Sequence, residues 1–318
     1  MNPVVFIVGC QRSGTTLLQR MVDASPHIAV VHESRWIDTW YRKRIGLTPD
    51  GNVTPDFIPL LLEHPRFPEL KASREDLEGL LPNGQPIPYR SFVSGVFDLH
   101  GRALGKPRVG DKTPRYVRSV PTLHELWPEA KFVHLIRDGR DVCLSALEWK
   151  SGGELSRRFE TWKTDPVATA GVWWDWLVRL GREAGEDLGP ALYHEIRYES
   201  LVSDPVEECA KLCEFLDIPY DSAMLRFHEG REREAPGLSA KGAWKRVTTG
   251  LRDWRTELSG ESVEVFEAAA GESLEELGYG RAVPEPGAMA VETVSRVRES
   301  FFQEVRAEGE RLPERWSR

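Results

Sequence analysis

The chain has few cysteines, no long apolar stretch and no excess of positive charge, and each shortage excludes a class of protein. Its four cysteines form neither a C-x-x-C pair nor a histidine cluster at zinc spacing, so we expect neither a disulfide framework nor a metal site. Cys209 and Cys213, four residues apart, are expected to be small buried hydrophobic residues of one helix. A net charge of -8 at pH 7 argues against a nucleic-acid binder, which usually has a basic face. An anionic substrate would therefore need a local basic pocket.

The N-terminus has no feature of an export signal or a membrane anchor. Met1 to Pro3 lead straight into the apolar run Val4 to Val8, which has no charged segment before it and is too short to span a bilayer. We therefore expect a cytoplasmic protein without a membrane span. Its 318 residues suffice for one large domain with a full core.

The most informative segment begins with that apolar run, which is typical of a strand buried on both faces of a parallel sheet. The loop Gly9 to Thr16 (G-C-Q-R-S-G-T-T) follows, and apolar residues at helical spacing continue to Pro26. Such a strand, loop and helix present backbone N–H groups to a phosphate. The pattern nearly matches a P-loop, but Thr15 stands where a triphosphate-binding loop needs lysine. The cation is instead Arg12, whose planar fork can hold phosphate or sulfate oxygens.

A second segment of the same kind lies about 120 residues further on. Lys131 to Ile136 predicts another buried strand, and Arg137 comes directly after it. Asp141 is a suitable cap for a following helix, which would place Ser145 about one turn into that helix. Arg137 and Ser145 could therefore converge on one anion.

The sequence R-S-G-T-T-L beginning at Arg12 resembles the loop of sulfotransferases that use 3'-phosphoadenosine 5'-phosphosulfate (PAPS). The resemblance covers roughly residues 4 to 280 and is densest at this loop. It implies PAPS as co-substrate, its desulfated form PAP as product, no metal, and a 3'-phosphate bound by Arg137 and Ser145. The residues that it assigns to the co-substrate at the first loop are Arg12, Ser13, Gly14, Thr15 and Thr16, and Arg12 is also assigned to catalysis.

Three further matches extend the resemblance. Asp111 to Pro114 (D-K-T-P) is similar to a segment whose lysine places a cation against the transferring group, which makes Lys112 a catalytic candidate. Tyr198 lies in R-Y-E-S-L, similar to a segment whose tyrosine is near the adenine. Lys245 and Arg246 belong to a basic, glycine-containing stretch where the family has a loop over the nucleotide; a solvated basic loop is the alternative.

The reaction needs a general base, and its usual place in cytosolic relatives holds no histidine, because Lys112 is followed by threonine, proline and arginine. The tyrosylprotein and several bacterial branches use a glutamate at the end of the second strand. Glu33, in His32-Glu33-Ser34-Arg35, is therefore the predicted base, and Arg35 is a predicted substrate contact. His32 is the alternative base. Since neighbouring strand residues point to opposite faces, we expect one of the two to face the site.

Strands alternating with helices predict an α/β fold: a single P-loop-like domain, with a central parallel sheet flanked by helices on both faces. We expect the sulfotransferase domain to span residues 1–280 and a C-terminal helical extension to span 281–318. The apolar stripe from Val291 to Val305 would pack on the core or on a twin subunit in a homodimer. The stretch Thr48 to Pro88 contains several prolines and is expected to be irregular.

The sequence leaves the acceptor open between small molecules, glycans, lipids, phenols and peptides that carry a hydroxyl, or an amine. Tryptophans could line an acceptor site, although Trp173 and Trp176 on one helix face are expected in the core. Two other functions were weighed. A P-loop kinase or NTPase would need the missing loop lysine and a magnesium-binding Asp111 or Asp138; a nucleotide-binding module without catalysis would not need both Glu33 and Lys112.

Overall fold

The computed structural model describes residues 3–149, 153–229, 246–248, 250 and 252–317. A five-stranded parallel sheet runs through the centre in the order β2-β5-β1-β6-β7. Its strands are β1 (Val5–Gly9), β2 (Ile28–His32), β5 (Arg108–Lys112), β6 (Lys131–Ile136) and β7 (Tyr193–Arg197). A second, antiparallel pair consists of β3 (Asn52–Val53) and β4 (Ile87–Pro88).

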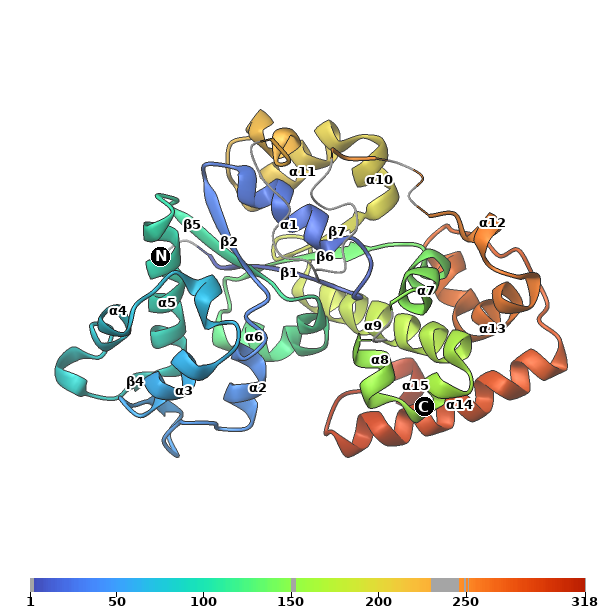
Figure 1. Cartoon of the computed structure of the whole chain (residues 1–318), viewed down its shortest axis with the longest axis horizontal. Helices are drawn as coiled ribbons and strands as arrows, with labels where there is room; N and C mark the ends of the chain where they lie inside the picture. Colours follow the sequence, from blue (N-terminus) through green and yellow to red (C-terminus); the bar gives the residue numbers. More distant parts are fainter. Residues whose placement is uncertain (1–2, 150–152, 230–245, 249, 251, 318) are drawn as a thin grey trace.

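Helices cover both faces of the sheet (Figure 1). The α-helices are α1 (Thr15–Ala24), α2 (Ile37–Arg42), α3 (Phe57–Glu63), α4 (Arg74–Glu78), α5 (Tyr89–Ala103), α6 (Val120–Leu126), α7 (Gly139–Leu147), α8 (Gly153–Arg158), α9 (Pro166–Leu188), α10 (Tyr198–Ser203), α11 (Pro205–Leu216), α12 (Trp254–Glu257), α13 (Gly260–Glu276), α14 (Ala288–Ala307) and α15 (Glu314–Ser317). The 3-10 helices are η1 (Phe67–Leu70), η2 (Pro82–Gly84), η3 (Pro114–Ser119), η4 (Glu160–Lys163) and η5 (Ser222–Arg226).

The central strand β1 divides the core in two, because its side chains alternate between faces. Val5 and Ile7 join the apolar cluster beneath α1, α10 and α11. Phe6 and Val8 join the larger cluster on the other face, which is built mainly with α5 and α9. All five residues of β1 are buried, as expected of a strand covered on both sides. The predicted α/β fold class is thus confirmed.

The C-terminal helix α14 packs on this chain's own core. Its buried residues include Val294, Val297 and Phe301, and the Phe301 ring stacks on Phe159 with 4.2 Å between centroids. Val291, at the start of the predicted stripe, is 49% exposed. The predicted domain boundary at residue 280 and the homodimer stay predictions.

The stretch 48–88, expected to be irregular, contains α3, α4 and two short 3-10 helices. A capping box between Ser73 and Asp76 holds the start of α4. Cys209 and Cys213 are free and buried, as predicted. Within the described residues, the structure contains no helix that is both long and apolar enough to cross a membrane.

Candidate active site

The loop after β1 adopts the phosphate-cradle form that its sequence predicts. Arg12 has φ 75° and Gly14 has φ 99°, so the chain turns through left-handed backbone before α1 begins at Thr15. A side chain at Gly14 is excluded as well, because a Cβ there would lie 2.5 Å from Cδ2 of Tyr198. Tyr198, predicted from a motif far along the chain, therefore packs directly on the loop.

The second predicted motif meets the first one at α7. The Arg12 Nε donates to the Ser145 Oγ over 2.9 Å, although the two residues are 133 positions apart. Arg137 follows β6, and its guanidinium lies over the Tyr198 ring, 4.3 Å from the centroid. The four side chains Arg12, Arg137, Ser145 and Tyr198 line one cavity together with Thr15 and Thr16.

One detail of this motif was predicted wrongly. Asp138, not Asp141, caps α7: its side chain accepts a hydrogen bond from the Arg140 backbone, and the helix begins at Gly139. Asp141 lies in the first turn, where its carboxylate accepts from Arg137 over 3.2 Å. Ser145 consequently lies nearly two turns into the helix, and it reaches the loop through its side chain rather than from the helix terminus.

The predicted base Glu33 lies directly after β2 and holds φ 57°. Its Oε1 accepts from the Lys112 Nζ over 2.8 Å, and its Oε2 accepts from the Arg35 Nε over 2.8 Å. Burial raises the pKa of Glu33, but the charges of Lys112 and Arg35 outweigh it and hold that pKa well below its usual range. Glu33 is therefore ionised at neutral pH.

Lys112 does not lie where its predicted catalytic role would place it, against the transferring group. Its side chain is fully buried beneath Glu33, with the Thr16 Oγ1 3.4 Å from Nζ, and it is not among the residues that line the cavity. Burial lowers the pKa of the ammonium, and the Glu33 carboxylate opposes this shift. In this structure Lys112 contacts the site through Glu33 and Thr16.

His32 and Glu33 both line the cavity, so the expectation that one of them faces away does not hold. The strand ends at His32, and the left-handed backbone at Glu33 turns its side chain back to the same side. Burial and the nearby Lys112 lower the pKa of His32 to about 3, which leaves it neutral at physiological pH. Of the two, Glu33 is the one that carries a charge at neutral pH.

Backbone strain is concentrated here. Arg12, Glu33 and Arg35 are three of the seven non-glycine residues with positive φ among the described residues. Each such residue costs of order 1–3 kcal/mol and persists only where its surroundings fix it. Arg35 is fixed by Glu33 and by the Arg115 side chain, which donates to its carbonyl.

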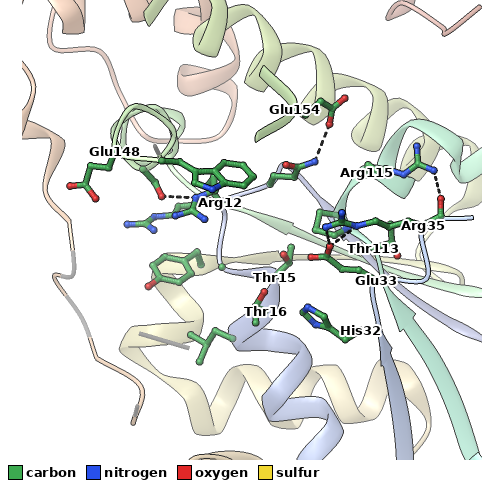
Figure 2. Close-up of a pocket in the computed structure, with 18 of the residues that line it drawn as sticks. Arg12, Thr15, Thr16, His32, Glu33, Arg35, Thr113, Arg115, Glu148 and Glu154 are labelled. Atoms are coloured by element: carbon green, nitrogen blue, oxygen red, sulfur yellow. Dashed lines mark hydrogen bonds and ion pairs between the residues drawn. The ribbon is translucent and has the colours of Figure 1, made fainter. Parts of the chain in front are cut away.

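The cavity measures about 820 Å³, within the usual range for a ligand site. Ten arginines and six glutamates line it among the described residues, although the whole chain has a net charge of -8. Figure 2 shows its two ends: Arg12 and Glu148 lie on one side, and Glu33, Arg35 and Arg115 lie on the other. The local basic pocket expected for an anionic substrate is therefore present.

Not every predicted residue reaches the cavity. Arg246 lines it, whereas Lys245 lies outside the described residues. Ser13 is fully buried within the loop and does not line it. Trp149 is a lining residue, but Trp36, Trp173 and Trp176 are buried core residues, as expected for the last two.

The sequence reasoning missed several cavity residues. The Gln11 Nε2 donates to Glu154 over 2.9 Å, and Glu154 accepts from Arg118 over 2.6 Å. Gln11 lies within the first loop but carries none of its resemblance, no motif surrounds Glu154 or Arg118, and the contact of Gln11 with Glu154 spans 143 positions. The lining residues missed in this way include Gln11, Arg66, Arg118, Glu148, Glu154, Arg157, Arg158, Arg252, Glu257, Glu308 and Glu310.

The two aspartates weighed as magnesium ligands are used otherwise. Asp111 is fully buried and accepts from the Ser34 backbone, and burial raises its pKa to about 6. Asp138 caps α7 and binds Arg140 and Trp254. Neither aspartate is among the described lining residues of the cavity. In the described part of the chain, no group of three or more His, Cys, Asp or Glu side chains is placed to hold a metal ion.

The comparisons with known proteins agree with this geometry. A model of the sulfotransferase family matches residues 3–222. The protein-tyrosine sulfotransferase of Drosophila melanogaster is 28% identical over 234 residues, which are 71% of this chain and 40% of that protein. The omega-hydroxy-beta-dihydromenaquinone-9 sulfotransferase Stf3 of Mycobacterium bovis is 23% identical over 329 residues, covering 90% of this chain and 77% of that protein.

A solved structure shares the fold. The sulfotransferase domain from the olefin synthase of Synechococcus PCC 7002 superposes with a TM-score of 0.54 at 21% identity, covering 95% of this chain and 94% of that domain. The chain spans about half the length, or less, of the first protein-tyrosine sulfotransferases that it matches, 40% for the fly protein and 53% for protein A of Caenorhabditis elegans.

Proposed function

The chain belongs to the sulfotransferase family, and we propose that it transfers the sulfuryl group of PAPS to an acceptor hydroxyl and releases PAP. The observation that carries the proposal is the hydrogen bond from Arg12 to Ser145. It joins the loop expected to hold the 5' end of the co-substrate to the helix expected to hold its 3'-phosphate. Arg137 lines the cavity beside them, so three groups suited to anions converge from two strand ends.

The proposed reaction is an in-line displacement. The acceptor oxygen attacks sulfur, the bond from sulfur to the bridging phosphate oxygen breaks, and the acceptor proton passes to Glu33. Arg12 and the loop N–H groups stabilise the charge that develops on the departing PAP. All atoms are accounted for by donor, acceptor and one carboxylate.

The ion pairs of Glu33 suggest how its weak basicity is overcome. The charges of Lys112 and Arg35 hold its pKa low. Arg35 has a side chain that is 47% exposed, so it can turn toward the sulfuryl group of a bound donor. Glu33 would then lose one pairing charge and become a stronger base in the complex that needs one.

The acceptor is proposed to be a hydroxyl compound. The relatives are named for protein tyrosine and for an omega-hydroxy menaquinone derivative. Hydroxyls of very different molecules are therefore acceptors within the family. These names leave the acceptor class to be argued from the cavity itself.

Ligand binding and transfer test the proposal. A ligand that binds the folded state stabilises it by about 2.7 kcal/mol at 100 times its Kd, so PAP should raise the unfolding temperature. ATP should do so much less, because Thr15 replaces the lysine that a triphosphate needs. Transfer of labelled sulfate from PAPS should persist in EDTA, since fixed cations supply the charge. Stabilisation by ATP with magnesium, together with ATP consumption, would instead indicate a kinase or NTPase.

A further inference from the structure

The C-terminal segment after α14 returns to the cavity. Glu308 and Glu310 line it, although the family model ends at residue 222. The position of Glu310 is fixed from both sides: its backbone N–H donates to the Val305 carbonyl, and the carbonyl of Arg311 accepts from the Trp176 Nε1 over 3.0 Å. The backbone at Glu310 is thus held between α14 and α9.

Glu310 completes a network that we name the charged wall: Arg118, Glu154, Arg158 and Glu310. Arg158 lies 2.8 Å from Glu310 and 3.4 Å from Glu154. Arg118 lies 2.6 Å from Glu154 and 3.3 Å from Glu310. The four side chains are 7 to 16% exposed, and both guanidinium groups stack on the Trp176 ring.

The charged wall contains two arginines and two glutamates, so its formal charges cancel. Burial raises the pKa of Glu154, but Arg118 and Arg158 outweigh it and hold that pKa below its usual range. The network does not satisfy all of its own groups, because Nε and Nη2 of Arg158 are buried without a hydrogen-bond partner among the described residues. A ligand at the charged wall meets a surface on which hydrogen-bond donors and acceptors alternate.

Few of the described residues that line the cavity have apolar side chains. Leu17, Val247 and Tyr198 line the cavity, but they belong to one apolar cluster with α1, at the nucleotide side. Pro114 and Trp149 are the other apolar lining residues among those described, and Arg12 already lies over the Trp149 ring, 5.2 Å from its centroid. Burying a phenol ring or a prenyl chain here would desolvate arginines and glutamates without an apolar partner.

We propose that the acceptor is a saccharide, and that Glu310 of the charged wall determines this specificity. Each sugar hydroxyl can donate to a carboxylate and accept from a guanidinium at once, which matches alternating Arg and Glu side chains. The inference rests on the proposed sulfuryl transfer and adds the acceptor class to it. Glu310 lines the cavity, so its carboxylate can itself accept from a sugar hydroxyl, and its ion pairs also hold Arg118 and Arg158 in place.

Labelled PAPS and an acceptor panel test this proposal: the saccharides chitobiose, lactose and trehalose, an acidic tyrosine peptide, and farnesol. We expect transfer to saccharides. Glu310→Gln should raise the saccharide KM by roughly 10 to 150 fold, the effect of losing a charged hydrogen bond. Because the group acts on binding, kcat and the calorimetric Kd for PAP should change little.

Glu299→Gln is the matched control, because Glu299 is an exposed carboxylate of the same C-terminal region, on α14, outside the charged wall. Glu310→Asp keeps the charge and should recover part of the saccharide affinity, which a purely structural role would not require. Equal KM values in the Glu310 and Glu299 variants would remove Glu310 from specificity.

Transfer to the peptide or to farnesol but not to saccharides would overturn the acceptor class and leave PAPS transfer standing. Wild-type protein that binds PAP but modifies no panel member would overturn it too. Failure of the wild type to bind PAP would instead refute the proposed function itself, so the two failures are distinguishable.

Discussion

Glu33→Gln tests the base and the buried ion pair in one experiment. The substitution keeps the shape of the side chain and removes its charge. If Glu33 takes the acceptor proton, turnover should fall by roughly 10² to 10⁴ fold, the usual contribution of general acid-base catalysis. The calorimetric affinity for PAP should stay near that of the wild type, because Arg12, Arg137 and Ser145 are untouched.

The same substitution should destabilise the fold. It leaves the Lys112 ammonium, which is fully buried, without the carboxylate 2.8 Å away. Removing one partner of a buried ion pair costs about 3–5 kcal/mol. We expect the lower end, about 3 kcal/mol or roughly 100-fold in the unfolding equilibrium, because Thr16 still lies 3.4 Å from the Nζ atom and the lysine can lose its proton.

A double variant separates the two effects. Glu33→Gln with Lys112→Met removes both charges, and well-packed apolar replacements of buried pairs are often neutral for stability. Urea unfolding should therefore show most of the lost free energy restored, while turnover stays low. Wild-type turnover in Glu33→Gln would remove Glu33 from the mechanism. A double variant no more stable than the single one would refute the energetic account of the pair.

Two further predictions concern the nucleotide and the pH profile. Arg137→Ala should weaken PAP binding by roughly 10 to 150 fold in calorimetry and hardly affect AMP, which lacks the 3'-phosphate; equal losses for both ligands would show that Arg137 supports the fold or the 5' end instead. Lys112→Met should move the acidic limb of kcat/KM to higher pH, because it removes the largest attraction that holds the pKa of Glu33 low and leaves the burial that raises it. Coincident limbs for variant and wild type would show that another group titrates there.

The two nucleotide motifs could be predicted because each is local in sequence. A buried strand, a turn and a helix follow one another within about 20 residues, and parallel strands bring their carboxyl ends to one edge. Arg12 and Arg137 could thus be expected at one edge of the sheet, whereas the hydrogen bond from Arg12 to Ser145 was not predicted. Asp141 was predicted as the helix cap in place of Asp138, because both aspartates suit a helix start.

Side-chain direction at strand ends could not be predicted in the same way. The alternation rule holds only while the backbone is extended, and Glu33 leaves the strand with φ 57°. The sequence H-E-S-R does not predict that conformation. It depends on the hydrogen bond from the Glu33 backbone N–H to the Lys112 carbonyl and on the buried Lys112 side chain below Glu33. The sequence motif identified Lys112 as a site residue. Its side chain is buried, which the motif does not predict, so Lys112 reaches the site only through Glu33 and Thr16.

The groups proposed to bind the donor and those proposed to select the acceptor come from different parts of the chain. The groups proposed to hold PAPS follow β1 and β6, within the 220 or so residues that the family model matches. The charged wall depends on Glu310, which lies beyond that match and is fixed through α9. If the proposal holds, changes in this C-terminal segment should alter acceptor selection and leave the donor site unchanged.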